Sequence, residues 1–70
     1  MKIKIKSYEK QDIMRILREW TGLTQKEFAK QIGKSVRTVQ GYEEGLINYN
    51  IDTILKIIKV FNMEMIIEKN

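Results

Sequence analysis

The feature that most constrains this chain is the very short connection between two helical patterns, at Gly33-Lys34-Ser35. Upstream, Thr24-Gln25-Lys26-Glu27 has the T-x-x-E form of a capping box and predicts the start of a helix. Gly33 suits the left-handed backbone that ends such a helix, and Ser35 suits the N-cap of the next one, which we expect to end at Gly45. The apolar positions of the two helices predict these core residues: Phe28, Ala29, Ile32, Val39 and Tyr42.

Two further amphipathic helices are predicted on either side of this pair. The first covers about residues 9–21, with Ser7 as its cap and Gly22 just beyond its end. The last begins after Asn50 and ends at Asn62. Apolar residues recur at helical spacing in both and predict these buried residues: Ile13, Ile16, Leu17 and Trp20 in the first, and Ile51, Ile54, Leu55, Ile58 and Phe61 in the last.

Both ends of the chain alternate apolar and polar residues, which predicts strands at about 2–6 and 63–68. Lysines would face Glu64 and Glu68 across the pair, a favourable pattern. An isolated two-stranded ribbon is marginal, so the strands should pack on the helices, extend across a dimer interface, or both. Two alternatives stay open, namely frayed termini and a DNA-seeking arm made of Lys2, Lys4 and Lys6.

Composition narrows the function classes. The 70 residues suggest one domain, 1–70, with a thin core that dimerisation would help. The absence of cysteine and histidine removes disulfides, the usual zinc ligands and the usual general base, so we expect no metal, no cofactor and no enzyme. No apolar run is long enough to span a membrane, and a cytoplasmic protein is expected. Residues 1–41 carry ten basic and four acidic residues, which suggests a polyanionic partner.

Two helices joined by a tight turn, the second with a polar face, form a helix-turn-helix, here residues 24–45. Residues 23–45 resemble, without gaps, the phage repressor and Cro-type helix-turn-helix family, also called the Xre family. The flanking helices extend the resemblance to about residues 10–61. It implies a mainly α, lambda-repressor-like domain of four to five helices, with a core at about residues 9–62.

The resemblance also implies an ion pair between Arg18 and Glu43, although two separate surface charges are the alternative. The chain departs from the family at Lys34, where an apolar residue is usual, and at Glu44, where Asn is common. The loop after the third helix, GLINYN, has no basic residue. Phosphate contacts there would have to come from Asn48, Tyr49 and Asn50, and from backbone amides at the start of the fourth helix.

In this fold the amino-terminal half of the third helix enters the major groove. With Val39 and Tyr42 facing inward, helical periodicity places Arg37 and Gly41 on the opposite side. Arg37 would read guanine, Gln40 would contact adenine or a phosphate, and Val36 would contact a thymine methyl group. Gly41 would let the helix approach DNA closely, or it is only a tolerated helix-weakening residue. Backbone contacts and sequence-independent attraction are expected from these residues: Gln25, Lys26, Lys30, Lys34, Ser35, Thr38 and Asn48.

The sequence therefore predicts a regulator that binds specific double-stranded DNA, acting as a homodimeric repressor on a roughly palindromic operator. The carboxy-terminal residues weakly resemble the strand ending of helix-turn-helix antitoxins, so a second function, holding a toxin protein, is an alternative. The strand interpretation places these residues in the dimer interface: Met63, Met65 and Ile67. A helix-turn-helix that has lost DNA binding and only dimerises is a further alternative.

Overall fold

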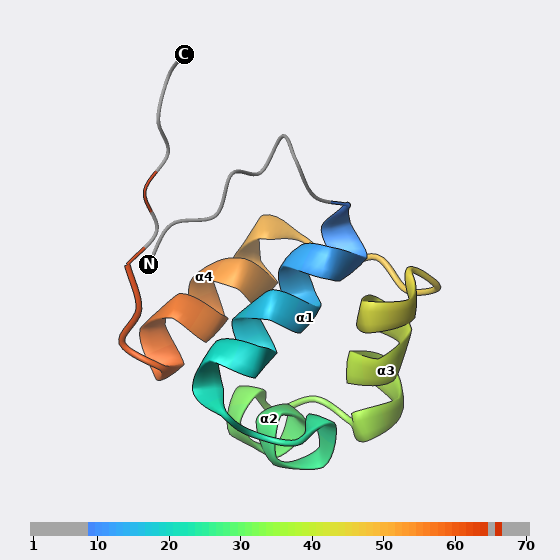
Figure 1. Cartoon of the computed structure of the whole chain (residues 1–70), viewed down its shortest axis with the longest axis horizontal. Helices are drawn as coiled ribbons and strands as arrows, with labels where there is room; N and C mark the ends of the chain where they lie inside the picture. Colours follow the sequence, from blue (N-terminus) through green and yellow to red (C-terminus); the bar gives the residue numbers. More distant parts are fainter. Residues whose placement is uncertain (1–8, 65, 67–70) are drawn as a thin grey trace.

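The computed structural model describes residues 9–64 and 66, and these residues form four helices (Figure 1). They are α1, Lys10–Thr21; α2, Gln25–Ile32; α3, Val36–Glu44; and α4, Ile51–Val60. The mainly α prediction is confirmed. Several predicted features lie outside the described residues: the strand at 2–6, its lysines, and the side chains of Met65, Ile67 and Glu68.

Local capping explains where the helices begin and end. The predicted capping box is present: the Glu27 N–H donates to Thr24 Oγ1 at 3.1 Å, and the Thr24 N–H donates to Glu27 Oε1 at 2.9 Å. Ser35 caps α3 through the N–H of Thr38, and Asn50 caps α4, as predicted. The N-cap residue of α1 is Glu9, so the prediction that Ser7 would cap this helix is wrong.

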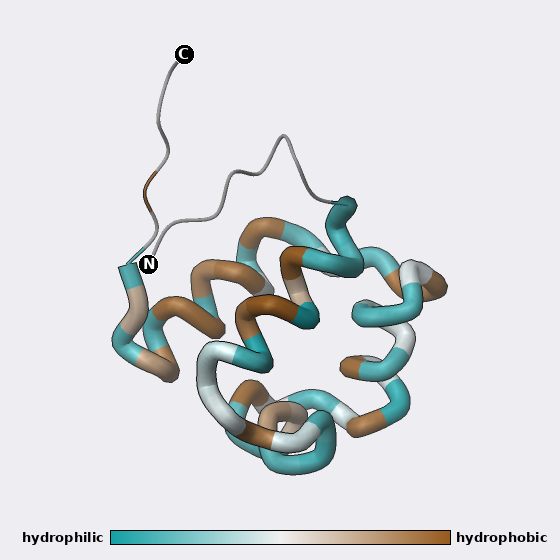
Figure 2. Tube along the Cα trace, viewed as in Figure 1, coloured by the Kyte–Doolittle hydropathy of each residue, from teal (hydrophilic) through white to brown (hydrophobic). Residues whose placement is uncertain are grey.

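Within residues 9–64, eight buried hydrophobic side chains from all four helices make the core: Met14, Leu17, Phe28, Ala29, Ile32, Val39, Tyr42 and Ile57. All five core residues predicted for α2 and α3 are among them. The ring of Phe28 stacks on that of Phe61, with centroids 5.3 Å apart. Figure 2 shows brown, hydrophobic stretches alternating with teal, hydrophilic ones along the helices.

The predicted buried faces of α1 and α4 need correction. Met14 is the fully buried residue of α1, whereas Trp20 is 36% exposed. In α4 only Ile57 is buried, and Leu55 lies in the solvent-exposed class. The reason lies in packing: α1 packs on α2 and α3, and α4 packs on α2, so the apolar stripes of α1 and α4 are only partly covered.

The end of α4 also differs from the prediction. The helix stops at Val60 rather than at Asn62, which has a positive φ of 52°. The N–H of Met63 then donates to the carbonyl of Ile58 at 2.8 Å, which folds the chain back on the helix. Met63, Glu64 and Ile66 are not in a strand, so the strand expected at 63–68 is absent from the part of it that the structure describes.

Candidate nucleic-acid interface

The connection from α2 to α3 is as short as the sequence predicts. Gly33 has a left-handed φ of 71°, and its N–H donates to the carbonyl of Lys30. The next N–H, of Lys34, donates to the carbonyl of Ala29 at 2.9 Å. These two bonds close the end of α2 and bring Ser35 directly to the start of α3, so the angle between the helices is set by backbone geometry.

The amino-terminal half of α3 presents its predicted base-reading side chains to solvent. Val36 is 40% exposed, and Arg37 and Gln40 are also exposed, while Val39 and Tyr42 hold the opposite side of the helix in the core. Among the described residues, the guanidinium of Arg37 has no hydrogen-bond or salt-bridge partner. Its five donors are therefore available to an external acceptor.

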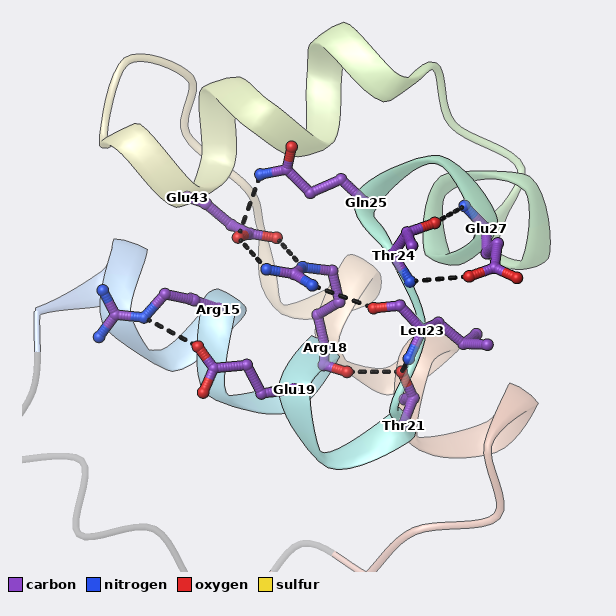
Figure 3. Close-up of polar contacts among 9 residues, drawn as sticks. All are labelled: Arg15, Arg18, Glu19, Thr21, Leu23, Thr24, Gln25, Glu27 and Glu43. Atoms are coloured by element: carbon purple, nitrogen blue, oxygen red, sulfur yellow. Dashed lines mark hydrogen bonds and ion pairs between the residues drawn. The ribbon is translucent and has the colours of Figure 1, made fainter.

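An ion pair joins α1 to the carboxy-terminal part of α3. The Nε of Arg18 donates to Glu43 Oε2 at 2.7 Å, and its Nη2 donates to Oε1 at 3.0 Å (Figure 3). The Arg18 Nη1 also donates to the carbonyl of Leu23, between α1 and α2. The hydrogen bond to Glu43 raises the pKa of Arg18. The side chain of Glu43 is only 5% exposed, so the predicted pair is structural rather than two separate surface charges.

Gln25 is also hydrogen-bonded to Glu43, a contact that the sequence did not indicate. Its Nε2 donates to Glu43 Oε1 at 3.3 Å, and Figure 3 shows the side chain reaching from the start of α2 toward α3. An amide nitrogen carries two hydrogens, so one N–H remains for another acceptor. Gln25 is half-buried, and the bond to Glu43 fixes its direction.

Ser35 and Thr38 are bound to one another. Ser35 Oγ accepts from the backbone N–H of Thr38 at 3.1 Å and lies 2.8 Å from Thr38 Oγ1. Ser35 is exposed, whereas Thr38 is half-buried. One of the two hydroxyl protons is used between them, which leaves the other for an external acceptor.

Gly41 does not lie where periodicity placed it. It is buried, and a Cβ at this position would lie 2.5 Å from Cγ1 of Ile47 and 3.1 Å from its Cβ. The N–H groups of Leu46 and Ile47 both donate to the Gly41 carbonyl, so the chain after α3 turns back over the glycine. The expectation that Gly41 faces outward is therefore wrong, and its missing side chain makes room for Ile47.

Of the three polar residues in the following loop, only Asn48 stays exposed without a partner among the residues the structure describes. Tyr49 donates its hydroxyl to the carbonyl of Lys10, and its ring packs edge-on against Tyr42 with centroids 5.6 Å apart. Burial raises the pKa of Tyr49. Asn50 Oδ1 accepts from Thr53 N–H at 3.0 Å. The expected phosphate contact from Tyr49 is therefore not supported by its position.

The remaining charged candidates are exposed. These are Lys26, Lys30 and Lys34. Glu44, the last residue of α3, is also exposed. Within residues 9–64 no salt bridge joins Lys34 to Glu44. No group of metal-binding side chains occurs in the described part of the chain. None of the four described helices is long and apolar enough to cross a bilayer.

Comparison with known proteins agrees with this geometry. A family model described as helix-turn-helix matches residues 14–66, which includes the α2–turn–α3 unit and most of the four-helix domain. Neither the curated proteins nor the solved structures give a match. The chain therefore belongs to the helix-turn-helix family of Cro/C1 (Xre) type, whose members are DNA-binding transcription regulators.

Proposed function

We propose that this regulator binds a specific double-stranded DNA sequence through α3 and represses transcription by occupying promoter DNA as a homodimer. The observation that carries the proposal is the exposure of Val36, Arg37 and Gln40 on one end of a helix whose other side is held by Val39 and Tyr42. A helix anchored in this way can enter a major groove without rearranging the core.

Each exposed side chain has a chemical partner in the groove. Arg37 can donate two parallel hydrogen bonds to O6 and N7 of a guanine, a contact worth about 1–3 kcal/mol of discrimination. Gln40 can pair with N6 and N7 of an adenine, and Val36 can contact a thymine methyl group. Because Gly41 is covered by Ile47, α3 offers no contact one turn after Arg37. We expect a short recognition sequence.

The sugar-phosphate backbone is contacted from several elements in this proposal. The second N–H of the Gln25 amide and the first-turn amides of α2 donate to one phosphate. Ser35 and Thr38 share one free hydroxyl proton for another phosphate, and Asn48 is exposed in the loop. Lys26 and Lys34 add attraction that does not depend on sequence.

A homodimer would read two half-sites about one helical turn, roughly 34 Å, apart on a palindromic operator. Support for a protein contact comes from large apolar side chains that remain exposed on α4 and just after it: Ile51, Leu55, Val60 and Ile66. Met63 packs partly against the core of its own chain. The dimer interface at Met63, Met65 and Ile67 stays a prediction, with the last two outside the described residues.

Selection of bound sequences from random duplex DNA tests this function. The full chain should enrich one motif at low salt, and its affinity should fall steeply as salt rises. Arg37→Ala should relax the preference at one base pair, whereas Lys26→Ala should weaken binding to all sequences alike. Lack of enrichment with the folded chain would contradict sequence-specific binding, and an unchanged motif for Arg37→Ala would contradict the role of Arg37.

The antitoxin alternative stays a prediction. It was motivated by a strand ending, and Met63, Glu64 and Ile66 are not in a strand. An antitoxin should co-purify with an unrelated toxin protein when the two genes are expressed together. A repressor without that function should elute alone and still protect its operator.

A further inference from the structure

An apolar groove lies between α1 and α4, and its described lining includes no residue of the α2–turn–α3 unit. Both helices contribute to its lining, and in Figure 1 they run in the same direction. The groove has a volume of about 700 Å³, and it is lined mainly by apolar side chains, among them Ile13, Leu17, Trp20, Ile54, Ile58 and Phe61. These residues include most of the apolar stripe that the sequence predicted to be buried. Leu17 is buried, whereas the other five are not fully covered by the four helices.

The chain that precedes α1 starts at one end of this groove. The hydroxyl of Tyr49 donates to the carbonyl of Lys10, and Tyr49 itself lines the groove. From Glu9 back to Ile3 an extended chain covers about 20 Å, at roughly 3.3 Å per residue. From Lys10 to Thr21 the helix α1 covers about 17 Å, at roughly 1.5 Å per residue. Residues 2–8 are therefore long enough to follow the groove along its whole length.

The pattern of residues 2–6 matches the groove in polarity and charge. In an extended chain Ile3 and Ile5 share one face, and Lys2, Lys4 and Lys6 share the other. An isoleucine face suits the apolar walls, and the lysine face would remain in water. Glu64 lines the far end of the groove, where the lysines nearest the amino terminus would arrive.

We propose that residues 2–6 of the same chain lie in the groove between α1 and α4, with Ile5 near Leu17 and Ile54, and Ile3 near Trp20 and Ile58. The segment completes the core that the four helices leave open. It also turns Lys2, Lys4 and Lys6 away from the helices into solvent. The DNA-reading residues of α3 do not line this groove, so the proposal does not depend on DNA binding. The groove does share Ile51 and Ile66 with the apolar surface that supports a protein contact, which leaves Leu55 and Val60 for that contact.

Trp20 reports directly on the groove, because it is the single tryptophan of the chain, lines the groove and is 36% exposed. The test compares three full-length proteins: the native chain, Ile3→Ser/Ile5→Ser, and the matched control Lys2→Ser/Lys4→Ser. The isoleucine variant should shift Trp20 emission to longer wavelength and increase its quenching by acrylamide. The lysine variant should leave both unchanged. Identical emission and quenching in all three proteins would overturn the proposal.

A second measurement separates the chain's own segment from that of a second copy. In the native protein, nuclear Overhauser effects should join the methyl groups of Ile3 to the Trp20 ring and those of Ile5 to the methyl groups of Leu17. In a mixture of labelled and unlabelled chains, an isotope filter should show that these effects are intramolecular. Their absence, or their appearance only between chains, would overturn the proposal. This measurement needs no variant, so it decides the question even if the isoleucine variant does not fold.

Discussion

The side chain of Ile47 lies against the Cα of Gly41, in the space that a Cβ at position 41 would occupy. The loop reaches this position because the N–H groups of Leu46 and Ile47 return to the Gly41 carbonyl. A glycine within a helix costs about 1 kcal/mol relative to alanine. Here that cost is offset by the packing of Ile47.

This contact predicts that the effect of Gly41→Ala on the free energy of unfolding depends on the side chain at position 47. In the native chain, the new methyl group should displace Ile47, and overpacking of about 1–3 kcal/mol should exceed the gain in helix propensity. In an Ile47→Ala background only the 3.1 Å approach to the Cβ of residue 47 remains, so the same change should cost less by about 1 kcal/mol or more. Urea unfolding of the four proteins of this cycle measures both values. A stabilising effect in the native background would show that Ile47 does not restrict position 41.

The pair of Arg18 and Glu43 predicts a large loss when only one partner is removed. Arg18→Met should lower the free energy of unfolding by about 3 kcal/mol, because the nearly buried carboxylate of Glu43 loses its fork of donors. Arg18→Met/Glu43→Met should recover much of this loss, because it leaves no charge unpaired. Thermal or urea unfolding measures each variant. If the double variant is no more stable than Arg18→Met, the loss comes from packing rather than from the charge of Glu43.

The capping box predicts a dependence of stability on pH. The hydrogen bond from the Thr24 N–H lowers the pKa of Glu27 below its ordinary value of 4.5. An acid whose pKa is lower in the folded chain stabilises the fold above its unfolded pKa, and the contribution is lost as pH falls through the folded value. The stability difference between the native chain and Glu27→Gln should therefore shrink below about pH 4.5. Urea midpoints from pH 7 to pH 3 test this, with Glu44→Gln as the control outside the capping box.

Gln25 predicts a loss of DNA affinity without a change of sequence preference. Gln25→Ala should weaken binding to all duplexes by about fivefold, the value of one hydrogen bond of about 1 kcal/mol. Stability should change little, since Arg18 still holds Glu43. Gln31→Ala is the matched control, because Gln31 is exposed six residues along the same helix, about 240° around its axis. Equal affinities for the two variants would exclude a phosphate contact from Gln25.

Sequence reasoning worked best where structure is determined within a few residues. The capping box at Thr24, the left-handed Gly33 and the cap at Ser35 depend on neighbours in the chain, and the structure confirms them. The core positions of α2 and α3 were also correct, because both helices bury a single face. The pair of Arg18 and Glu43 came from the family resemblance, since no local pattern joins residues so far apart.

The same reasoning failed where burial depends on how distant segments meet. Periodicity placed Gly41 outward, but it has no information about a loop that returns over the helix. In α4 the apolar stripe faces two surfaces, the core through Ile57 and the groove through Ile54 and Ile58. A hydrophobic pattern shows that these residues form an apolar face of α4. It does not show which of them pack in the core and which line the groove. Met14 was missed because Ile13 and Leu17 already completed the expected stripe.

The hydrogen bond between Gln25 and Glu43 has a consequence for how this regulator can change in evolution. Val36, Arg37 and Gln40 are exposed on α3, so in the proposed complex mutations there would change the base preference at little cost to folding. Gln25 has no such freedom, because the carboxylate that orients it also holds α1 against α3. Under the proposed function, base preference would therefore diverge quickly among descendants of this chain, while the phosphate contact of Gln25 would be inherited together with the fold.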